Sequence, residues 1–358
     1  MSDTIKIASS IHDYSIHFEE DLSFLTVLLK EDDALFIVDK NVARIYAPQF
    51  ADMSGKDNIV LLDAIEDRKT LSGAEDIFDH LLTLRTTKKT RIISIGGGIT
   101  QDVSGFAAST FYRGLNWVYV PTTLLAQADS CMGSKTSLNY KSYKNILGTF
   151  YPPHTIYIAP SFTSTLCDED FYSGMGEIAK LHVMGGLESL TLLNENLVQV
   201  ANREIPVILE LIKSSLNIKW SYMESDEFDQ GKRNMLNYGH CFGHAIETAV
   251  QYRIPHGQAV VLGMILANKA ALEKNLISEA LNNKLNTLFF SIAKSDYRIL
   301  NEIDDQLIID AMKQDKKRVG VGLPLIMLNE QFEFFKITDL KTVEVANTLK
   351  YFKDTYCN

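Results

Sequence analysis

The sequence has few cysteines and a shortage of positive charge. Its 358 residues include only four cysteines, Cys131, Cys167, Cys241 and Cys357, without paired spacing or a thiol metal motif. We therefore expect reduced thiols in a cytoplasmic protein. Lysine and arginine number 35 against 45 acidic residues, giving a formal charge of -10. This balance argues against binding to nucleic acid or to an anionic membrane, although a basic pocket for a small anion is compatible with it.

Long apolar runs are also absent. No stretch is apolar for long enough to span a bilayer, and the start, Met1 to Lys6, lacks the charged-then-apolar pattern of a signal peptide. The overall content of 46% hydrophobic and 22% charged residues is typical of a globular protein. The length exceeds what one compact core normally supports, so we expect two domains.

The first part of the chain alternates short β-branched runs with helical patterns. Strands are expected at 34–39, 58–62, 91–95 and 117–120, and helices at 70–84 and 100–112. Ser72 and Glu75 resemble a capping box near the start of the first helix. This order predicts an α/β, Rossmann-like N-terminal domain with a parallel sheet.

The second part is dominated by helical periodicity. Helices are expected at 170–184, 205–223, 234–251, 258–274, 278–293 and 304–316. Pro152-Pro153 and Pro160 punctuate the chain between the two parts. We therefore predict an α/β domain over 1–158 and a mainly α-helical C-terminal domain over 159–358.

Three of the eight histidines fall between positions 240 and 256. His240 and His244 are four residues apart, so on a helix they share one face, and His256 follows after a turn. Histidines from two neighbouring elements, joined by a carboxylate, are a usual ligand set for a divalent metal. A single buried histidine is more often a satisfied core residue, but this clustering favours a site.

A glycine run and a strand-ending acid point to a nucleotide. Gly96-Gly97-Gly98 stands between an expected strand and helix, where backbone amides can hold a phosphate or pyrophosphate. Asp39 ends another strand, as does the acid that binds a ribose hydroxyl in nucleotide-binding units. The glycines do not match the common GxGxxG pattern and could form only a tight turn, but the two features together favour a dinucleotide.

Several cations fall among small or apolar residues. Lys135, Lys144 and Asn145 lie in and after a stretch of small residues, which suits a flexible loop that binds an oxyanion, or simply a solvated loop. Glu177 and Lys180 are three apart on one helix face, as in an ordinary surface ion pair or a buried site.

Arg233 and Asn237 lead into the histidine segment, and Lys219 precedes them. On one continuous helix, Arg233, Asn237 and His240 would share a face with His244. We expect this row to form one wall of a polar cavity.

These motifs together resemble the 3-dehydroquinate synthase family of sugar-phosphate cyclases. They recur in the family's order over about residues 35–320: Gly96 to Phe106, Arg113-Gly114, Val120 to Gln127, Lys135-Thr136, Lys144-Asn145, Glu177 with Lys180, Leu236 to His240, Phe242 to Glu247, and His256-Gly257.

The resemblance implies a role for each matching residue. Glu177, His240 and His256 would bind a divalent metal, Zn²⁺ in preference to Co²⁺, and His244 would transfer protons during phosphate elimination. The residues implied to contact substrate are Lys135, Asn145, Lys180, Lys219, Arg233, Asn237 and Lys317, the last favoured over Lys316. The residues implied to hold NAD are Asp39, Asn41, Glu66, Lys69, Gly97, Gly98, Asp102, Thr122, Thr123, Asp129 and Lys144. Arg113 would reach the phosphate site of a neighbouring subunit, which implies a homodimer.

The reaction that the resemblance implies converts 3-deoxy-arabino-heptulosonate 7-phosphate into 3-dehydroquinate and phosphate, in the shikimate pathway. Gln101, Ser134 and Ser137 stand where the family commonly has glycine, and Gln258 where glutamate is usual. These departures leave two alternatives open. One is a related cyclase acting on sedoheptulose 7-phosphate or glucose 6-phosphate, and the other is a metal- and NAD-dependent alcohol dehydrogenase.

Overall fold

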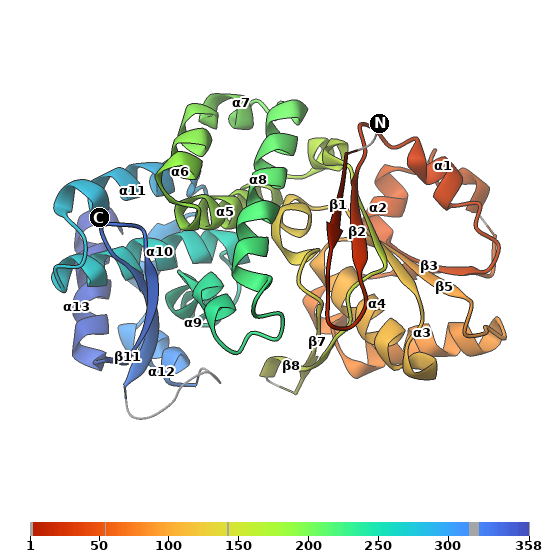
Figure 1. Cartoon of the computed structure of the whole chain (residues 1–358). Helices are drawn as coiled ribbons and strands as arrows, with labels where there is room; N and C mark the ends of the chain where they lie inside the picture. The colour runs from red at the N-terminus through yellow and green to blue at the C-terminus, as the bar shows by residue number, and fades with distance from the viewer. Residues whose placement is uncertain (1–2, 54, 142, 315–321, 358) are drawn as a thin grey trace. The chain divides into compact units, whose positions relative to one another are not determined.

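The chain divides into two compact units, Met1–Leu166 (unit 1) and Cys167–Asn358 (unit 2). The computed structural model describes residues 3–53, 55–141, 143–314 and 322–357. Figure 1 shows strands together with helices in the N-terminal part and mostly helices in the C-terminal part.

Unit 1 is built on one seven-stranded sheet. Its order is β1-β2-β9-β6-β5-β3-β4. The strands are β1 (Asp3–Ile7), β2 (Tyr14–Phe18), β3 (Ala34–Asp39), β4 (Ile59–Leu62), β5 (Arg91–Gly96), β6 (Trp117–Pro121) and β9 (Thr155–Ile158). All neighbours pair in parallel except β1 and β2, which are antiparallel. The predicted α/β class is confirmed, whereas β1, β2 and β9 were not predicted.

The central strands of this sheet are covered on both faces, which explains their continuous apolar runs. Leu35 to Val38 on β3 and Val118 to Val120 on β6 are fully buried. The helices of unit 1 are α1 (Phe24–Leu28), α2 (Lys40–Ile45), α3 (Leu71–Thr83) and α4 (Gly98–Thr110). The capping-box prediction was wrong, because the N-cap of α3 is Thr70, whose hydroxyl accepts from the backbone N–H of Gly73 at 3.3 Å.

The segment after β6 that contains Lys135, Lys144 and Asn145 also differs from its prediction. It is not a flexible loop but an antiparallel hairpin of β7 (Lys135–Tyr140) and β8 (Tyr143–Phe150). Along β7, Thr136 and Leu138 are buried and their neighbours in sequence are not, as a half-buried strand requires. The small residues that suggested flexibility instead allow the hairpin to pack against α4.

Unit 2 is mainly helical. Its helices are α5 (Asp168–Met184), α6 (Gly186–Glu195), α7 (Leu197–Ala201), α8 (Ile205–Met223), α9 (His240–Ala249), α10 (His256–Glu273), α11 (Glu279–Ile292), α12 (Asp305–Lys313) and α13 (Thr342–Phe352). A two-stranded hairpin of β10 (Leu323–Leu328) and β11 (Phe334–Leu340), which was not predicted, lies against α10. The predicted helical class of this part is confirmed.

The helix expected over 234–251 is broken. Lys232–Asn237 forms a separate 3-10 helix, and α9 begins only at His240. Gly239 between them has a φ of 78°, in the left-handed region that ends a helix. A Cβ at this position would lie 2.7 Å from the Val260 carbonyl oxygen, so α10 also requires glycine there.

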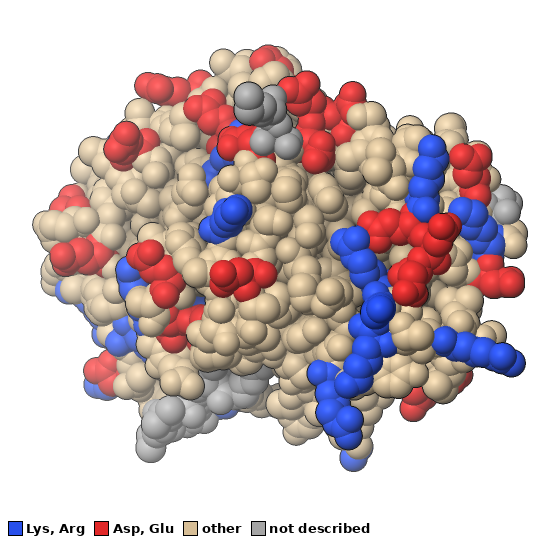
Figure 2. All heavy atoms as spheres, turned by 45° about the vertical axis from the view of Figure 1, so that its right-hand side comes forward, with Lys and Arg blue, Asp and Glu red and all other residues tan. Residues whose placement is uncertain are grey.

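Within the described residues, no helix combines the length and apolarity needed to cross a membrane. Acidic and basic side chains are mixed over the face of the molecule drawn in Figure 2.

Candidate functional site

The first group of predicted residues lies where the parallel strands of unit 1 end. Asp39 closes β3, Gly97 and Gly98 follow β5, and Thr122 follows β6. Between β3 and β5 the order of the strands reverses direction along the sheet. In open α/β sheets, ligands bind beyond the carboxyl ends of the strands at such a reversal.

The turn after β5 has the geometry that suits a pyrophosphate. Helix α4 begins at Gly98 with Gly97 as its N-cap, so the first N–H groups of the helix are available to an anion. A Cβ on Gly97 would approach the Thr123 side chain to 3.0 Å and narrow the turn. Thr122 donates its backbone N–H to Gly96 and fixes the turn to the end of β6. These residues therefore fit a dinucleotide.

A polar network around the buried Lys69 connects predicted cofactor and substrate residues. Lys69 lies 2.6 Å from an Asp102 carboxylate oxygen and donates to the Asn145 side-chain carbonyl at 2.6 Å. Ser137 donates its N–H to Asp102 and its hydroxyl to Asn145. Burial raises the pKa of Asp102, and the Lys69 ammonium opposes this effect. The serine hydroxyl thus adds one hydrogen bond that a glycine at this position could not form, whereas the backbone N–H would be present with either residue.

A second set of contacts holds Glu66 next to this network. Asn139 donates to the Glu66 carboxylate at 2.8 Å, and Lys144 lies 3.3 Å from it. Burial acts to raise the pKa of Glu66, but Asn139 and the two lysines Lys144 and Lys69 hold it below its ordinary value. Five predicted residues are thus joined by direct or shared contacts: Glu66, Lys69, Asp102, Lys144 and Asn145. Lys135 lies at the start of the same hairpin.

The other predicted residues of unit 1 take separate positions. Asp39 accepts from the backbone N–H of Asn41 at 2.7 Å and caps α2. Asp129 lies on a short π-helix, Ala126–Ser130. Arg113 is exposed at the end of a 3-10 turn, and it and Tyr112 both have positive φ angles. Backbone strain of this kind is often retained where a side chain has a function.

The second group of predicted residues comes together in unit 2 around Glu177. This carboxylate is fully buried on α5. Its Oε1 lies 3.6 Å from Nε2 of His240 and 3.3 Å from Nε2 of His256. Its Oε2 lies 2.5 Å from the ammonium of Lys180, which is also buried. The ion pair suggested by the spacing is therefore in the interior, not on the surface.

Close packing of α5 and α10 brings Glu177 to the histidines. A Cβ on Gly176 would lie 2.2 Å from the Gly257 carbonyl oxygen, and one on Gly257 would lie 1.8 Å from that of Ser173. Glycine is therefore needed on both helices for this approach. The Ser173 hydroxyl accepts from the backbone N–H of Gly257 at 3.0 Å and fixes the start of α10.

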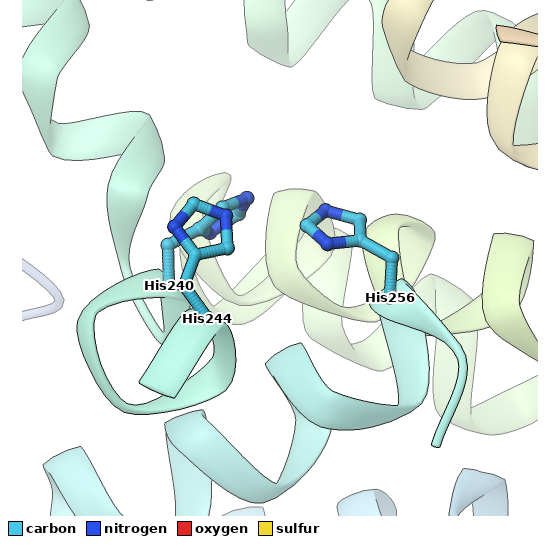
Figure 3. A group of neighbouring side chains, drawn as sticks. All are labelled: His240, His244 and His256. Carbon is cyan, nitrogen blue, oxygen red and sulfur yellow. The ribbon is translucent and has the colours of Figure 1, made fainter. Parts of the chain in front are cut away.

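Three histidine rings surround the same point. His240 and His244 project from α9 toward His256 at the start of α10, as Figure 3 shows. One potential ligand atom from each ring lies within 4.8 Å of those of the others. The prediction of a histidine cluster is confirmed, and the structure contains two possible ligand sets: the three histidines, or Glu177 with His240 and His256.

The charges of this group depend on one another. Burial acts to raise the pKa of Glu177, but Lys180 and the histidines hold it well below its usual range. Burial, reinforced by the Lys180 charge, lowers the pKa of His240 well below its ordinary value. Burial acts in the same direction on His256, but the carboxylates of Glu247 and Glu177 raise its pKa to about 10.

The group fits a divalent cation. Oε1 of Glu177 is buried, and among the described residues no donor has the geometry to form a hydrogen bond with it. A buried carboxylate oxygen in this state costs free energy that a cation would recover. One carboxylate and two imidazole nitrogens form a set of three ligands that leaves a coordination position for a substrate oxygen.

Buried cations from neighbouring elements add positive charge in unit 2. Lys219 comes from α8, which packs against the 3-10 helix that carries Arg233. Both side chains are buried, at 7% and 5% exposure. Arg233 donates to the Glu227 carbonyl oxygen, and Asn237 donates to that of Asn234. The predicted continuous row from Arg233 to His244 is wrong, because the helix is interrupted at Gly239.

Lys317 and its alternative Lys316 lie outside the described residues. No role was predicted for Glu247 from the sequence. The signal was present, because Glu247 lies seven residues after His240 on α9, and this spacing returns to the same helix face. Asp226 was also missed. Its carboxylate accepts from the backbone N–H groups of Gln230, Gly231 and Arg233, and so shapes the loop before Arg233.

Comparisons with known proteins agree with this arrangement. Residues 59–173 match the family model described as 3-dehydroquinate synthase N-terminal, and residues 174–318 match 3-dehydroquinate synthase C-terminal. A 3-dehydroquinate synthase of Acetivibrio thermocellus is 34% identical over 297 residues, which are 82% of each chain.

Two solved structures share the fold. The 2-epi-5-epi-valiolone synthase of Streptomyces hygroscopicus, with NAD⁺ and Zn²⁺ bound, is 21% identical with a TM-score of 0.82 and 98% coverage of both chains. A 2-deoxy-scyllo-inosose synthase complexed with carbaglucose-6-phosphate, NAD⁺ and Co²⁺ is 24% identical with a TM-score of 0.81. It covers 98% of this chain and 100% of its own.

The family models span both units, and the relative matches over most of its length. The chain is therefore a member of the 3-dehydroquinate synthase family.

Proposed function

We propose that the protein is a 3-dehydroquinate synthase, which converts 3-deoxy-arabino-heptulosonate 7-phosphate into 3-dehydroquinate and inorganic phosphate. The observation that carries the proposal is the buried Glu177 carboxylate, which faces Nε2 of both His240 and His256. Family membership gives this geometry its chemical meaning. The class is a carbon–oxygen lyase without net redox change.

Glu177, His240 and His256 would hold the divalent ion, for which we propose Zn²⁺. When bound, the metal would polarise a substrate hydroxyl, and NAD would accept a hydride from that carbon and later return it. In the substrate, the oxidised carbon is bonded to the carbon that loses a proton, and the phosphate leaves from the carbon beyond that one. The chain must therefore hold this C–H bond and the phosphate in the orientation that elimination requires. Burial of Glu177 and Lys180 keeps water away from their side of the metal site.

His244 has the properties of a proton carrier. It is exposed, unlike Glu177, and its ring centroid lies 5.2 Å from that of His240 and 5.5 Å from that of His256. An imidazole that solvent can reach is able to pass a proton between the substrate and water. We propose that His244 transfers the proton that accompanies phosphate departure.

The cations would hold the two anionic ends of the substrate. We assign to substrate binding the residues Lys135, Asn145, Lys180, Lys219, Arg233, Asn237 and Lys317. Lys219 and Arg233 are buried cations on two elements that pack against each other, and their charges suit a carboxylate. Sedoheptulose 7-phosphate and glucose 6-phosphate have no carboxylate, so these cations favour the heptulosonate over the substrates of related cyclases.

NAD would bind at the carboxyl ends of β3, β5 and β6. We assign to it Asp39, Asn41, Glu66, Lys69, Gly97, Gly98, Asp102, Thr122, Thr123, Asp129 and Lys144. The glycine turn and the N-terminus of α4 supply N–H groups for the pyrophosphate, and Asp39 supplies an acceptor for a ribose hydroxyl. A homodimer, in which Arg113 reaches the neighbouring subunit, and a cytoplasmic location complete the proposal.

The test uses metal-stripped protein with added Zn²⁺ and a catalytic amount of NAD. It is incubated separately with the heptulosonate phosphate, sedoheptulose 7-phosphate and glucose 6-phosphate, while phosphate, product mass and NADH absorbance are followed. We expect phosphate and 3-dehydroquinate from the heptulosonate only, without accumulation of NADH. Phosphate release from another sugar alone would identify a different cyclase, and accumulation of NADH without phosphate would identify a dehydrogenase.

A further inference from the structure

Each of the two histidines that face Glu177 has a hydrogen-bond acceptor at its other ring nitrogen, Nδ1. Nδ1 of His240 lies 3.2 Å from the backbone carbonyl oxygen of Tyr238, and Nδ1 of His256 lies 3.1 Å from a carboxylate oxygen of Glu247. A carbonyl and an ionised carboxylate can only accept, so each Nδ1 carries the proton. With a proton held on Nδ1, Nε2 is the ring nitrogen that can bind a metal, and in His256 the ion would displace the proton that Nε2 carries beside the Glu177 carboxylate.

The two supporting acceptors differ in how easily they could move. Tyr238 is buried, and its hydroxyl donates to the Asn268 side chain at 2.6 Å, so the carbonyl that supports His240 is part of a fixed backbone segment. His256 stands at the first residue of α10 and is 35% exposed. It depends on a side chain from the neighbouring helix, and the Glu247 side chain is only 12% exposed.

We propose that Glu247 is a positioning residue that fixes the orientation and tautomer of His256 for metal binding. This inference rests on the proposed function, because it requires the ion held by Glu177, His240 and His256. The geometry supports it directly, since one ring connects two carboxylates: Nδ1 to Glu247 at 3.1 Å and Nε2 to Glu177 at 3.3 Å. Partners of this kind, on the far side of a ligand histidine, typically contribute 10–100-fold to metal affinity.

The test measures the affinity of metal-stripped protein for Zn²⁺ by competition with a chelating dye, and the visible spectrum of the Co²⁺ form. The variants are Glu247→Ala, Glu247→Gln and His256→Ala. Glu273→Ala is the matched control, because this glutamate on α10 pairs with Lys269. Thermal unfolding without metal establishes that each variant is folded.

We expect Glu247→Ala to bind Zn²⁺ about 10–100-fold more weakly than the parent, with an altered Co²⁺ spectrum. The Zn²⁺ affinity of Glu247→Gln should lie between those of the parent and Glu247→Ala, because the amide oxygen can still accept from Nδ1. Glu247→Gln also provides the comparison if the alanine variant does not fold. Glu273→Ala should match the parent.

Parent-like affinity and spectrum in both Glu247 variants, together with loss of metal in His256→Ala, would overturn the role of Glu247 and leave the proposed function intact. A parent protein that binds neither metal would overturn both.

Discussion

At the scale of single residues, buried polar side chains in unit 2 are matched to their partners by donor and acceptor type. Gln258, which replaces the family's usual glutamate, donates its amide to the carbonyl oxygens of Tyr172 and Ile292. Its amide oxygen accepts from the backbone N–H groups of Lys294 and Ser295. A neutral amide thus joins the start of α10 to α5 and to the segment after α11.

Replacing this amide with a carboxylate should destabilise the protein. In Gln258→Glu, the Tyr172 and Ile292 carbonyls lose their donor and face a buried negative charge. We expect a loss of about 3 kcal/mol in the free energy of unfolding, measured by denaturant titration. Gln331→Glu makes the same chemical change at an exposed position and should stay within about 0.5 kcal/mol. Equal effects of the two substitutions would contradict this role for Gln258.

His182 on α5 should make stability depend on pH. Burial lowers its pKa to about 4, whereas an unfolded histidine titrates near 6.5. Below 6.5 the unfolded state therefore binds the extra proton first, so stability falls as the pH drops from 6.5 to 4. The contribution of this one residue is about 3 kcal/mol over that interval.

His182→Met should remove that part of the acid sensitivity, as measured by unfolding at several pH values. Some should remain, because burial also lowers the pKa of His154 to about 4. An unchanged dependence on pH in the methionine variant would show that His182 is not the group responsible.

At the scale of elements, the site depends on how α9 begins and how closely it approaches α10. Gly239 supplies the left-handed residue that separates the 3-10 helix of Arg233 from α9. Its Cβ position is already occupied by α10, with Met264 Cγ at 2.6 Å and the Val260 carbonyl oxygen at 2.7 Å. The direction of His240, the first residue of α9, follows from this junction.

Gly239→Ala should therefore lower the free energy of unfolding by more than backbone strain alone, because the new Cβ would also clash with α10. We expect a loss of at least about 2 kcal/mol in stability, together with weaker metal binding. Gly186→Ala is the control, because Gly186 also has a positive φ, 84°, but its Cβ would meet no atom within 4 Å. That variant should lose only about 1 kcal/mol and bind metal normally. If both lost the same amount, the close approach of α9 to α10 would contribute nothing.

The sequence was more informative about chemistry than about the shape of short elements. Histidine spacing predicted the cluster because His240 and His244 do share one helix face. The break at Gly239 was missed because the apolar period continues across it, and a single glycine is tolerated in many helices. The β7–β8 hairpin was missed because polar residues such as Ser137, Asn139 and Asn145 interrupt its apolar alternation, and its packing against α4 decides its conformation.

At the scale of the whole molecule, the proposed NAD residues lie in unit 1 and the proposed metal ligands lie in unit 2. The chain has a net charge of -10, yet Lys69, Lys180, Lys219 and Arg233 are buried. Buried cations are costly unless paired, and the carboxylates of Asp102 and Glu177 offset part of that cost for Lys69 and Lys180. The family models match residues in both units. The proposed NAD site and the proposed metal site can nevertheless be tested separately, by adding one ligand at a time.

NAD and Zn²⁺ should each raise the temperature of thermal unfolding of metal-stripped protein. At a concentration 100 times its dissociation constant, a ligand stabilises the folded state by about 2.7 kcal/mol. Asp39→Ala should reduce the shift produced by NAD and leave that of Zn²⁺ unchanged, and His256→Ala should do the reverse. Loss of both shifts in either folded variant would contradict separate sites.

The most direct measurement is the metal content of His244→Ala beside those of Glu177→Gln and His256→Ala, after dialysis against Zn²⁺ and removal of free ion. Glu177, His240 and His256 as the ligands predict about one Zn²⁺ per chain in the parent and in His244→Ala, and nearly none in the other two. His244→Ala should lose phosphate release but keep its metal. Loss of metal from His244→Ala, with retention by Glu177→Gln, would show instead that the three histidines hold the ion.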